Sequence, residues 1–331
     1  MRGSRVRHST LPPDEPASAA DGFTAPMRPS GDRRTVSLVV QLAGGLGNQL
    51  FQYAAGRAVA ARSDVELALD DVGGFARDRR FRRRFELGVF GVRARIATRL
   101  ERWVSSFDLL GRPLHGRRRL VRRTPWGDFV RETGQRHLPE LAAFRASRPT
   151  WMKGYWQSPE YFEFLADELR AELDPPTPDD ARIVGLGREV ERRGAVAVGV
   201  RLYEETRDPA SNARDGRAWS IESQAEAVHA LLRAEPGILP LVFCTHRAQA
   251  LERLRMPPET VFVTETEGYR GAVPNLWLLS RCRHHVFNNS TFYWWGAWLS
   301  EGRGPADARR RIVASDSFIN VDGLPARWER F

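Results

Sequence analysis

Lysine and cysteine are both scarce in this chain of 331 residues. Lys153 is the only lysine among 51 basic residues, so the other 50 are arginines. Cys244 and Cys282 have no metal-ligand spacing, and both stand in apolar surroundings. Two buried thiols are therefore expected, and a cysteine-based metal site is not.

Long apolar runs are also missing, although 42% of the residues are hydrophobic. No stretch approaches the roughly 20 apolar residues that span a bilayer, and no apolar stretch follows Met1 as it would in a secretory signal. The apolar content is enough for two globular domains of ordinary size. We therefore expect a cytoplasmic protein. Peripheral attachment to the inner face of the membrane is compatible with this expectation.

The charge is strongly basic, with a formal net charge of +10 and an isoelectric point near 10.5. Arginines cluster at 77–84 and at 117–123, with apolar residues between them. A solvated helical face explains such runs best, adhesion to anionic lipid comes second, and nucleic-acid binding comes third. Because coding bias also favours arginine over lysine, the charge alone does not decide the partner.

A strand, a glycine-rich turn and a helix are predicted near the N-terminal end. Residues 37–42 are apolar and rich in β-formers, 43–48 contain three glycines, and 49–62 have apolar residues along one helical face. Such a turn lets the backbone approach a ligand closely. It departs from a dinucleotide fingerprint because Leu50 stands where a third small residue is needed.

A polar group followed by aromatic residues is the most informative segment of the chain. A short strand is predicted at 283–287, and Asn289, Ser290 and Thr291 come between it and a helix rich in tryptophan. Helix N-termini bind anions because their backbone N–H groups and dipole favour negative charge, and hydroxyls add donors. Asn, Ser and Thr are also ordinary N-cap residues, which is the likelier explanation for this segment taken alone.

Together, the segments 44–54 and 289–299 resemble the two terminal signatures of the glycosyltransferase family that contains the α-1,2-fucosyltransferases. Residues 154–162 resemble that family's middle segment, and 276–282 resemble the helix before its last motif. The likeness runs from about residue 36 to the end and is closest to bacterial members. It implies a GT-B-like fold, GDP-fucose as donor, inversion at the sugar carbon, and no metal or other cofactor.

The donor-binding motif of that family is altered here. The family pattern His-x-Arg-Arg-Gly-Asp aligns with residues 199–204, where Gly199 replaces the histidine, Leu202 the second arginine and Glu204 the aspartate. Arg201 is retained, and one guanidinium can bind a diphosphate if hydroxyls and N–H groups complete the shell. Thr245 and His246 replace a family acidic pair, which leaves the identity of the donor open.

The fold class expected is α/β, with two Rossmann-like domains built on parallel sheets. Residues 1–34 are predicted to be a disordered tail, 35–173 an acceptor-side α/β domain, 174–194 a linker with a connecting helix, and 195–331 a nucleotide-sugar-binding α/β domain. Strands at 195–201, 239–244, 261–263 and 284–287 alternate with helix-compatible stretches, as in a parallel sheet covered on both faces. Ligands bind such sheets at the C-terminal ends of the strands.

The site residues follow from this arrangement. We expect Arg201 to stabilise the leaving diphosphate, with Asn289, Ser290 and Thr291 completing the donor site. Glu204 is the first candidate for the base, ahead of Glu205, Asp70 and Asp71. Contacts with acceptor or sugar are expected from five residues, namely Gly45, Gly47, Asn48, Tyr155 and Trp156. The tryptophans at 294, 295 and 298 have the spacing of helix residues packed under a sheet, so we expect them in the core.

The function expected is therefore transfer of fucose from GDP-fucose to a glycan hydroxyl, in the manner of a galactoside 2-α-L-fucosyltransferase. The altered motif keeps two alternatives open, a transferase for another nucleotide sugar and a degenerate homologue that binds without turnover. A basic nucleic-acid-binding protein is the last alternative. If the chain is a transferase, we expect its partners to be the donor and the acceptor and not a nucleic acid. The sequence does not reveal the acceptor or the oligomeric state.

Overall fold

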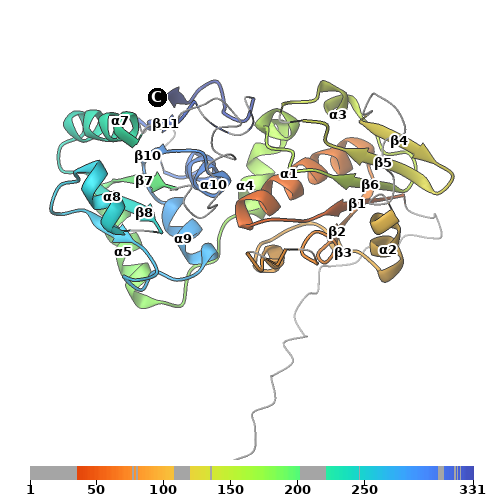
Figure 1. Ribbon diagram of the computed structural model, residues 1–331, viewed down its shortest axis with the longest axis horizontal. Helices are drawn as coiled ribbons and strands as arrows, with labels where there is room; N and C mark the ends of the chain where they lie inside the picture. Colours follow the sequence, from red (N-terminus) through yellow and green to blue (C-terminus); the bar gives the residue numbers. More distant parts are fainter. Residues whose placement is uncertain are drawn as a thin grey trace, which may run out of the picture. The chain divides into compact units, whose positions relative to one another are not determined.

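The computed structural model describes residues 36–331 except 77, 80, 108–119, 135, 202–220, 246, 305–308, 317, 319 and 321. The predicted tail at 1–34 lies outside the described residues. Thr35–Phe331 form one compact unit by their internal contacts. The described parts of that unit contain two six-stranded sheets (Figure 1).

The first sheet has the strand order β3-β2-β1-β6-β5-β4 and is parallel except for the β4–β5 pair. Its central strand forms from the predicted apolar run, in which Leu38, Val39 and Val40 are all buried, as expected for a strand covered on both faces. The strands are β1 (Ser37–Gln41), β2 (Glu66–Asp70), β3 (Arg95–Ile96), β4 (Val121–Thr124), β5 (Gly127–Arg131) and β6 (Thr150–Lys153).

Helix α1 (Leu46–Ser63) connects β1 to β2 and begins three residues earlier than the helix predicted at 49–62. Gly45 is its N-cap residue, so Asn48 lies in the first helical turn and not in the loop. The remaining helices of this half are α2 (Arg99–Phe107), α3 (Pro139–Ala143) and α4 (Ala166–Glu172), with 3-10 turns η1 (Leu87–Val89), η2 (Pro159–Tyr161) and η3 (Glu163–Leu165).

The second sheet is parallel throughout its described strands, in the order β12-β11-β10-β7-β8-β9. Its strands are β7 (Ala195–Val200), β8 (Leu239–Cys244), β9 (Val261–Val263), β10 (His284–Phe287), β11 (Ile312–Ala314) and β12 (Glu329–Arg330). The helices are α5 (Ala181–Arg193), α7 (Ile221–Ala234), α8 (Arg247–Leu254), α9 (Ala272–Leu279) and α10 (Thr291–Ser300). The expected α/β class with two parallel-dominated sheets is thus confirmed.

An aromatic core joins helix α1 to helix α10. The ring of Phe51 lies 4.5 Å from that of Trp294, and Phe162 stacks on Trp295 at 5.7 Å between ring centroids. Trp294, Trp295 and Trp298 are fully buried, which confirms that their helical spacing marks a packed face. The core therefore continues from the half that carries the first sheet into the half that carries the second.

Two further expectations concern the cysteines and the arginine runs. Both thiols are buried, as predicted, and burial raises the pKa of Cys244 to about 11. The arginine runs are not helical where they are described, because residues 81–84 are irregular and Arg122 and Arg123 lie on strand β4 with exposed side chains.

In the described part of the chain, no helix has the length and apolar character needed to cross a membrane.

Candidate functional site

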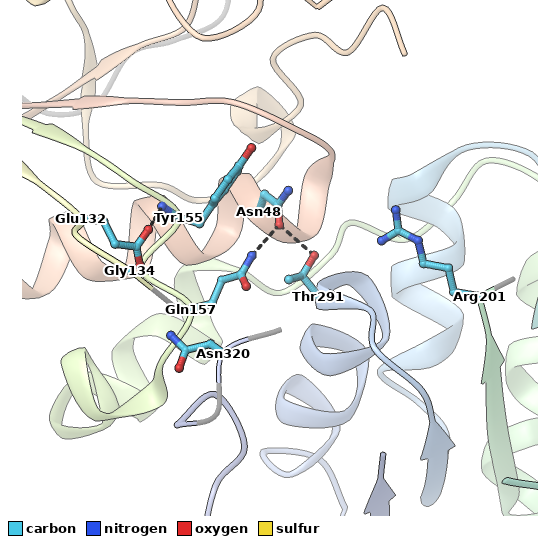
Figure 2. A pocket seen from close by; sticks show the side chains of 8 residues that line it. All are labelled: Asn48, Glu132, Gly134, Tyr155, Gln157, Arg201, Thr291 and Asn320. Atoms are coloured by element: carbon cyan, nitrogen blue, oxygen red, sulfur yellow. Dashed lines mark hydrogen bonds between the residues drawn. The ribbon is translucent and has the colours of Figure 1, made fainter. Parts of the chain in front are cut away.

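A cavity of about 290 Å³ opens where carboxyl ends of strands from both sheets meet (Figure 2). Glu132 follows β5, Tyr155 follows β6, Arg201 follows β7, and Thr291 starts the helix after β10. These are the strand ends at which open α/β sheets bind ligands. The described residues that line the cavity are Asn48, Glu132, Gly134, Tyr155, Gln157, Arg201, Thr291 and Asn320.

Asn48 connects the two sides of the cavity. Its Oδ1 accepts hydrogen bonds from Gln157 Nε2 at 3.1 Å and from Thr291 Oγ1 at 3.0 Å (Figure 2). Because the oxygen serves both neighbours, the side chain is fixed in one orientation with its amide nitrogen as the remaining donor. Asn48 was predicted to contact acceptor or sugar, and the structure places it between the segments that follow β6 and β10.

Gly47 lies where helix α1 comes close to the start of helix α10. A Cβ atom at Gly47 would lie 2.6 Å from the backbone nitrogen of Phe292 and 2.7 Å from Thr291 Oγ1. Glycine is therefore required by the approach of two backbones. Gly45 has no such constraint, since its nearest neighbour would be the Arg83 guanidinium at 3.6 Å. Neither glycine belongs to the lining of the cavity.

Arg201 is held by its backbone. Its N–H donates to Asn288 Oδ1 at 3.0 Å, and its carbonyl accepts from Asn288 Nδ2 at 2.6 Å. Asn288 is buried, with 1% of its surface exposed, so these two hydrogen bonds fix the backbone of the residue that directly follows β7. Figure 2 shows the Arg201 side chain extending towards Asn48 and Thr291. The sequence contained Asn288 within the polar segment, but its positioning role is visible only in the structure.

The three residues predicted at the helix start take different positions. Thr291 lines the cavity, whereas Asn289 and Ser290 are buried and are not part of the lining. Ser290 occupies the N-cap position of α10, yet its side chain makes no capping hydrogen bond to the helix. The ordinary capping role therefore does not account for its hydroxyl.

Tyr155 and Trp156, both predicted to contact acceptor or sugar, have opposite surroundings. Tyr155 lines the cavity with 46% of its surface exposed. Trp156 is fully buried, so its ring has no surface for a sugar in this structure. Its backbone adopts a φ of +55°, a strained value for a bulky residue. The predicted sugar contact is therefore wrong for the Trp156 ring, because a position in a loop does not make a side chain exposed.

Tyr293 explains why a side chain is absent at Gly199. A Cβ atom at Gly199 would lie 2.4 Å from the Tyr293 ring, so a histidine has no room there. The Tyr293 hydroxyl donates to the carbonyl of Phe243 at 3.0 Å, near the end of β8. The tyrosine ring therefore fills the space beside the strand at Gly199.

Of the predicted acids, Asp70 and Asp71 are described, and neither lines the cavity. Asp70 is fully buried, and its Oδ1 accepts from the Gly73 N–H at 2.8 Å. Asp71 pairs with Arg102 at 2.6 Å. Leu202, Glu204, Glu205 and His246 lie outside the described residues. Where the chain is described, no group of three or more His, Cys, Asp or Glu side chains is placed to hold a metal ion, and metal independence stays a prediction.

Known proteins that are similar to this chain include glycosyltransferases. No family model matches the chain. The alpha-1,2-colitosyltransferase of Escherichia coli is 23% identical over 302 residues, covering 88% of this chain and 98% of that protein. The O-antigen biosynthesis glycosyltransferase WbnK of the same organism is 25% identical over 311 residues, covering 85% and 99%. The crystal structure of the fucosyltransferase NodZ from Bradyrhizobium is 17% identical with a TM-score of 0.45, covering 81% and 94%. Similarity to the first two proteins along most of the chain supports a glycosyltransferase, at low identity.

Proposed function

We propose that this chain is an inverting glycosyltransferase that transfers fucose from GDP-fucose to a glycan hydroxyl in α-1,2 linkage. One observation carries the proposal: Arg201 and Thr291, from the second half, line the same cavity as Asn48 and Tyr155, from the first. A transferase needs such a shared space because donor and acceptor must meet within it.

The donor diphosphate would lie between Arg201 and the start of helix α10. Departure of a nucleoside diphosphate builds negative charge, which a guanidinium and helix N–H groups stabilise. The position is suited to this because Asn288 fixes the Arg201 backbone at both its N–H and its carbonyl. We propose that these groups take the place of a divalent cation, so that transfer continues in the presence of a chelator.

A colitosyl donor is the second candidate. The name of the E. coli relative supports it, because that protein is an alpha-1,2-colitosyltransferase and matches 88% of this chain. The same linkage would be made to the acceptor, and only the sugar would differ. The third alternative is a homologue that binds the nucleotide sugar without turnover, and the experiments must distinguish it from a fucosyl and a colitosyl transferase.

Thermal melting with GDP, GDP-fucose and the colitosyl nucleotide tests donor binding, because a ligand of the native state raises the melting temperature. In Arg201→Ala, loss of a charge-assisted contact should weaken donor affinity by about 10- to 100-fold. Arg192→Ala is the matched control, since Arg192 is exposed on α5 and pairs only with Glu189 among the contacts described.

Three results would contradict the proposal. Equal melting shifts in both arginine variants would place the diphosphate elsewhere. Shifts that vanish with a chelator would show that a metal is required. If the chain binds GDP-fucose but releases no GDP in the presence of galactosides, it is a nucleotide-sugar-binding protein and not a transferase.

A further inference from the structure

Glu132 is the acidic side chain among the described residues that line the cavity. It directly follows β5, and its Oε2 and Oε1 accept the backbone N–H groups of Tyr155 at 2.6 Å and Trp156 at 3.0 Å. Each carboxylate oxygen has a further lone pair, so these bonds leave acceptor capacity on both. Figure 2 shows Glu132 and Tyr155 on one side of Asn48 and Arg201 on the other.

The surroundings of Glu132 are built to hold this carboxylate. Gly154 is required beside it, because a Cβ atom there would lie 2.4 Å from Glu132 Cβ and 2.9 Å from its Oε2. The Glu132 N–H donates to the Lys153 carbonyl at 3.0 Å, which continues the pairing of β5 with β6. Trp156 stays at its strained φ of +55° with a fully buried ring. Backbone strain of this kind clusters at functional sites.

The basicity of Glu132 fits proton transfer. Burial raises the pKa of its carboxyl above the ordinary value of 4.5, and the N–H groups of Tyr155 and Trp156 only partly oppose this. A general base works best when its pKa approaches the working pH, so a raised carboxyl pKa is an advantage here. Asp70 and Asp71, by contrast, are committed to other partners away from the cavity.

We propose that Glu132 is the catalytic base of the sugar transfer, an inference that rests on the proposed function. The proton of the acceptor hydroxyl moves to a Glu132 carboxylate oxygen while the acceptor oxygen forms a bond to the anomeric carbon of the sugar. The bond from that carbon to the donor diphosphate breaks, and its electron pair leaves with the diphosphate beside Arg201. Glu132 then releases its proton to water.

The position of Tyr155 indicates which substrate lies next to this base. Its half-exposed side chain lines the same cavity, and its backbone N–H donates to the Glu132 carboxylate. Aromatic rings offer an apolar face to the C–H groups of a sugar while leaving sugar hydroxyls free for polar partners. The acceptor sugar would therefore lie against Tyr155 with its reacting hydroxyl at Glu132.

The test is release of GDP from GDP-fucose, measured with lactose as acceptor and separately with water alone, with the colitosyl nucleotide as a parallel donor. Glu132→Gln should lower release at least about 100-fold and remove its rise with pH, while the melting shift caused by GDP stays unchanged. Glu160→Gln is the matched control, because its carboxylate lies outside the cavity lining, is 61% exposed and pairs with His137 at 3.1 Å. It should behave as the unmodified chain.

Chemical rescue separates a base from a residue that merely shapes the loop. Added formate should partly restore release to Glu132→Ala, because an external carboxylate replaces the missing base but cannot rebuild the turn. Release by Glu132→Gln within a few-fold of the unmodified chain would overturn the role of Glu132 and leave the proposed function standing. GDP binding without release by the unmodified chain would overturn both the base and the transfer, and absence of GDP binding would overturn the donor site itself.

Discussion

Because Gly47 has no side chain, helix α1 can lie directly against the start of helix α10 at Thr291 and Phe292. The added methyl of Gly47→Ala would meet the Phe292 nitrogen and Thr291 Oγ1 at less than 3 Å. We expect the change to cost about 1–3 kcal/mol of unfolding free energy, because overpacking forces backbones apart. It should also weaken the Asn48–Thr291 hydrogen bond and with it donor binding. Urea unfolding and melting shifts with GDP measure the two effects.

The matched control is Gly45→Ala in the same loop. Gly45 has an ordinary φ of −74°, and a Cβ atom there would be 3.6 Å from its nearest neighbour. Because Gly45 is the N-cap residue of α1, where alanine is less favourable than glycine, its unfolding free energy should fall by less than about 1 kcal/mol. Equal losses in the two variants would mean that helix α1 is sensitive to any added methyl, and that the close approach at Gly47 has no special effect.

Single residues were predicted unevenly from the sequence. Asn48, Tyr155, Arg201 and Thr291 could be selected because motifs in four separate segments singled them out, and all four line the cavity. Glu132 could not be selected, since an isolated glutamate after a strand looks like any surface acid. Its importance depends on its position beside the Tyr155–Trp156 turn, which no local pattern encodes.

At the scale of elements, strands with continuous apolar sequence were predicted best. The ranges 239–244, 261–263 and 284–287 agree with β8, β9 and β10. Strands β8 and β9 have the near-continuous apolar sequence of buried parallel strands, whereas β10 begins with two histidines before Val286 and Phe287. The two-residue strands β3 and β12 lack such a signal. Strand β4 carries two exposed arginines, which made its sequence resemble a charged helix face.

Strand β10 makes stability depend on pH. Burial lowers the pKa of His285 to about 3 and that of His284 to about 4, with nearby arginines adding to the effect. His284 accepts the Arg311 N–H through Nδ1 at 3.0 Å, so its neutral form is the one that fits. The unfolded chain binds protons below about pH 6.5 and the folded chain does not. The contribution of the two neutral histidines to the free energy of unfolding should therefore be fully present above pH 6.5. It should fall by up to about 1.4 kcal/mol per pH unit for each histidine as the pH drops towards 4.

Urea unfolding between pH 7.5 and 4.5 measures this slope. His285→Gln removes one titrating group and retains an amide donor for the Cys282 carbonyl, which the ring nitrogen contacts at 3.2 Å. Its slope should be smaller than that of the unmodified chain. An identical slope would assign the acid sensitivity to other groups.

At the scale of the whole molecule, the formal charge of +10 predicts adhesion to anionic surfaces. The full chain should sediment with vesicles that contain phosphatidylserine at low salt and be released as salt increases, because exposed charges are screened. Vesicles of phosphatidylcholine alone are the control and should leave it in solution. Equal retention by both lipids would contradict an electrostatic origin, and preferential capture by RNA would favour a nucleic-acid partner.

The predicted boundaries of two separate domains stay a prediction, but the continuous core of Phe51, Phe162 and the tryptophans of α10 has a consequence for modularity. Exchanging the residues after 174 for those of a related transferase would bring a foreign α10 against the native α1. The swap would break the ring contacts and the Gly47 approach together. We therefore expect that an exchange at residue 174 does not transfer specificity unless α1 is exchanged together with α10.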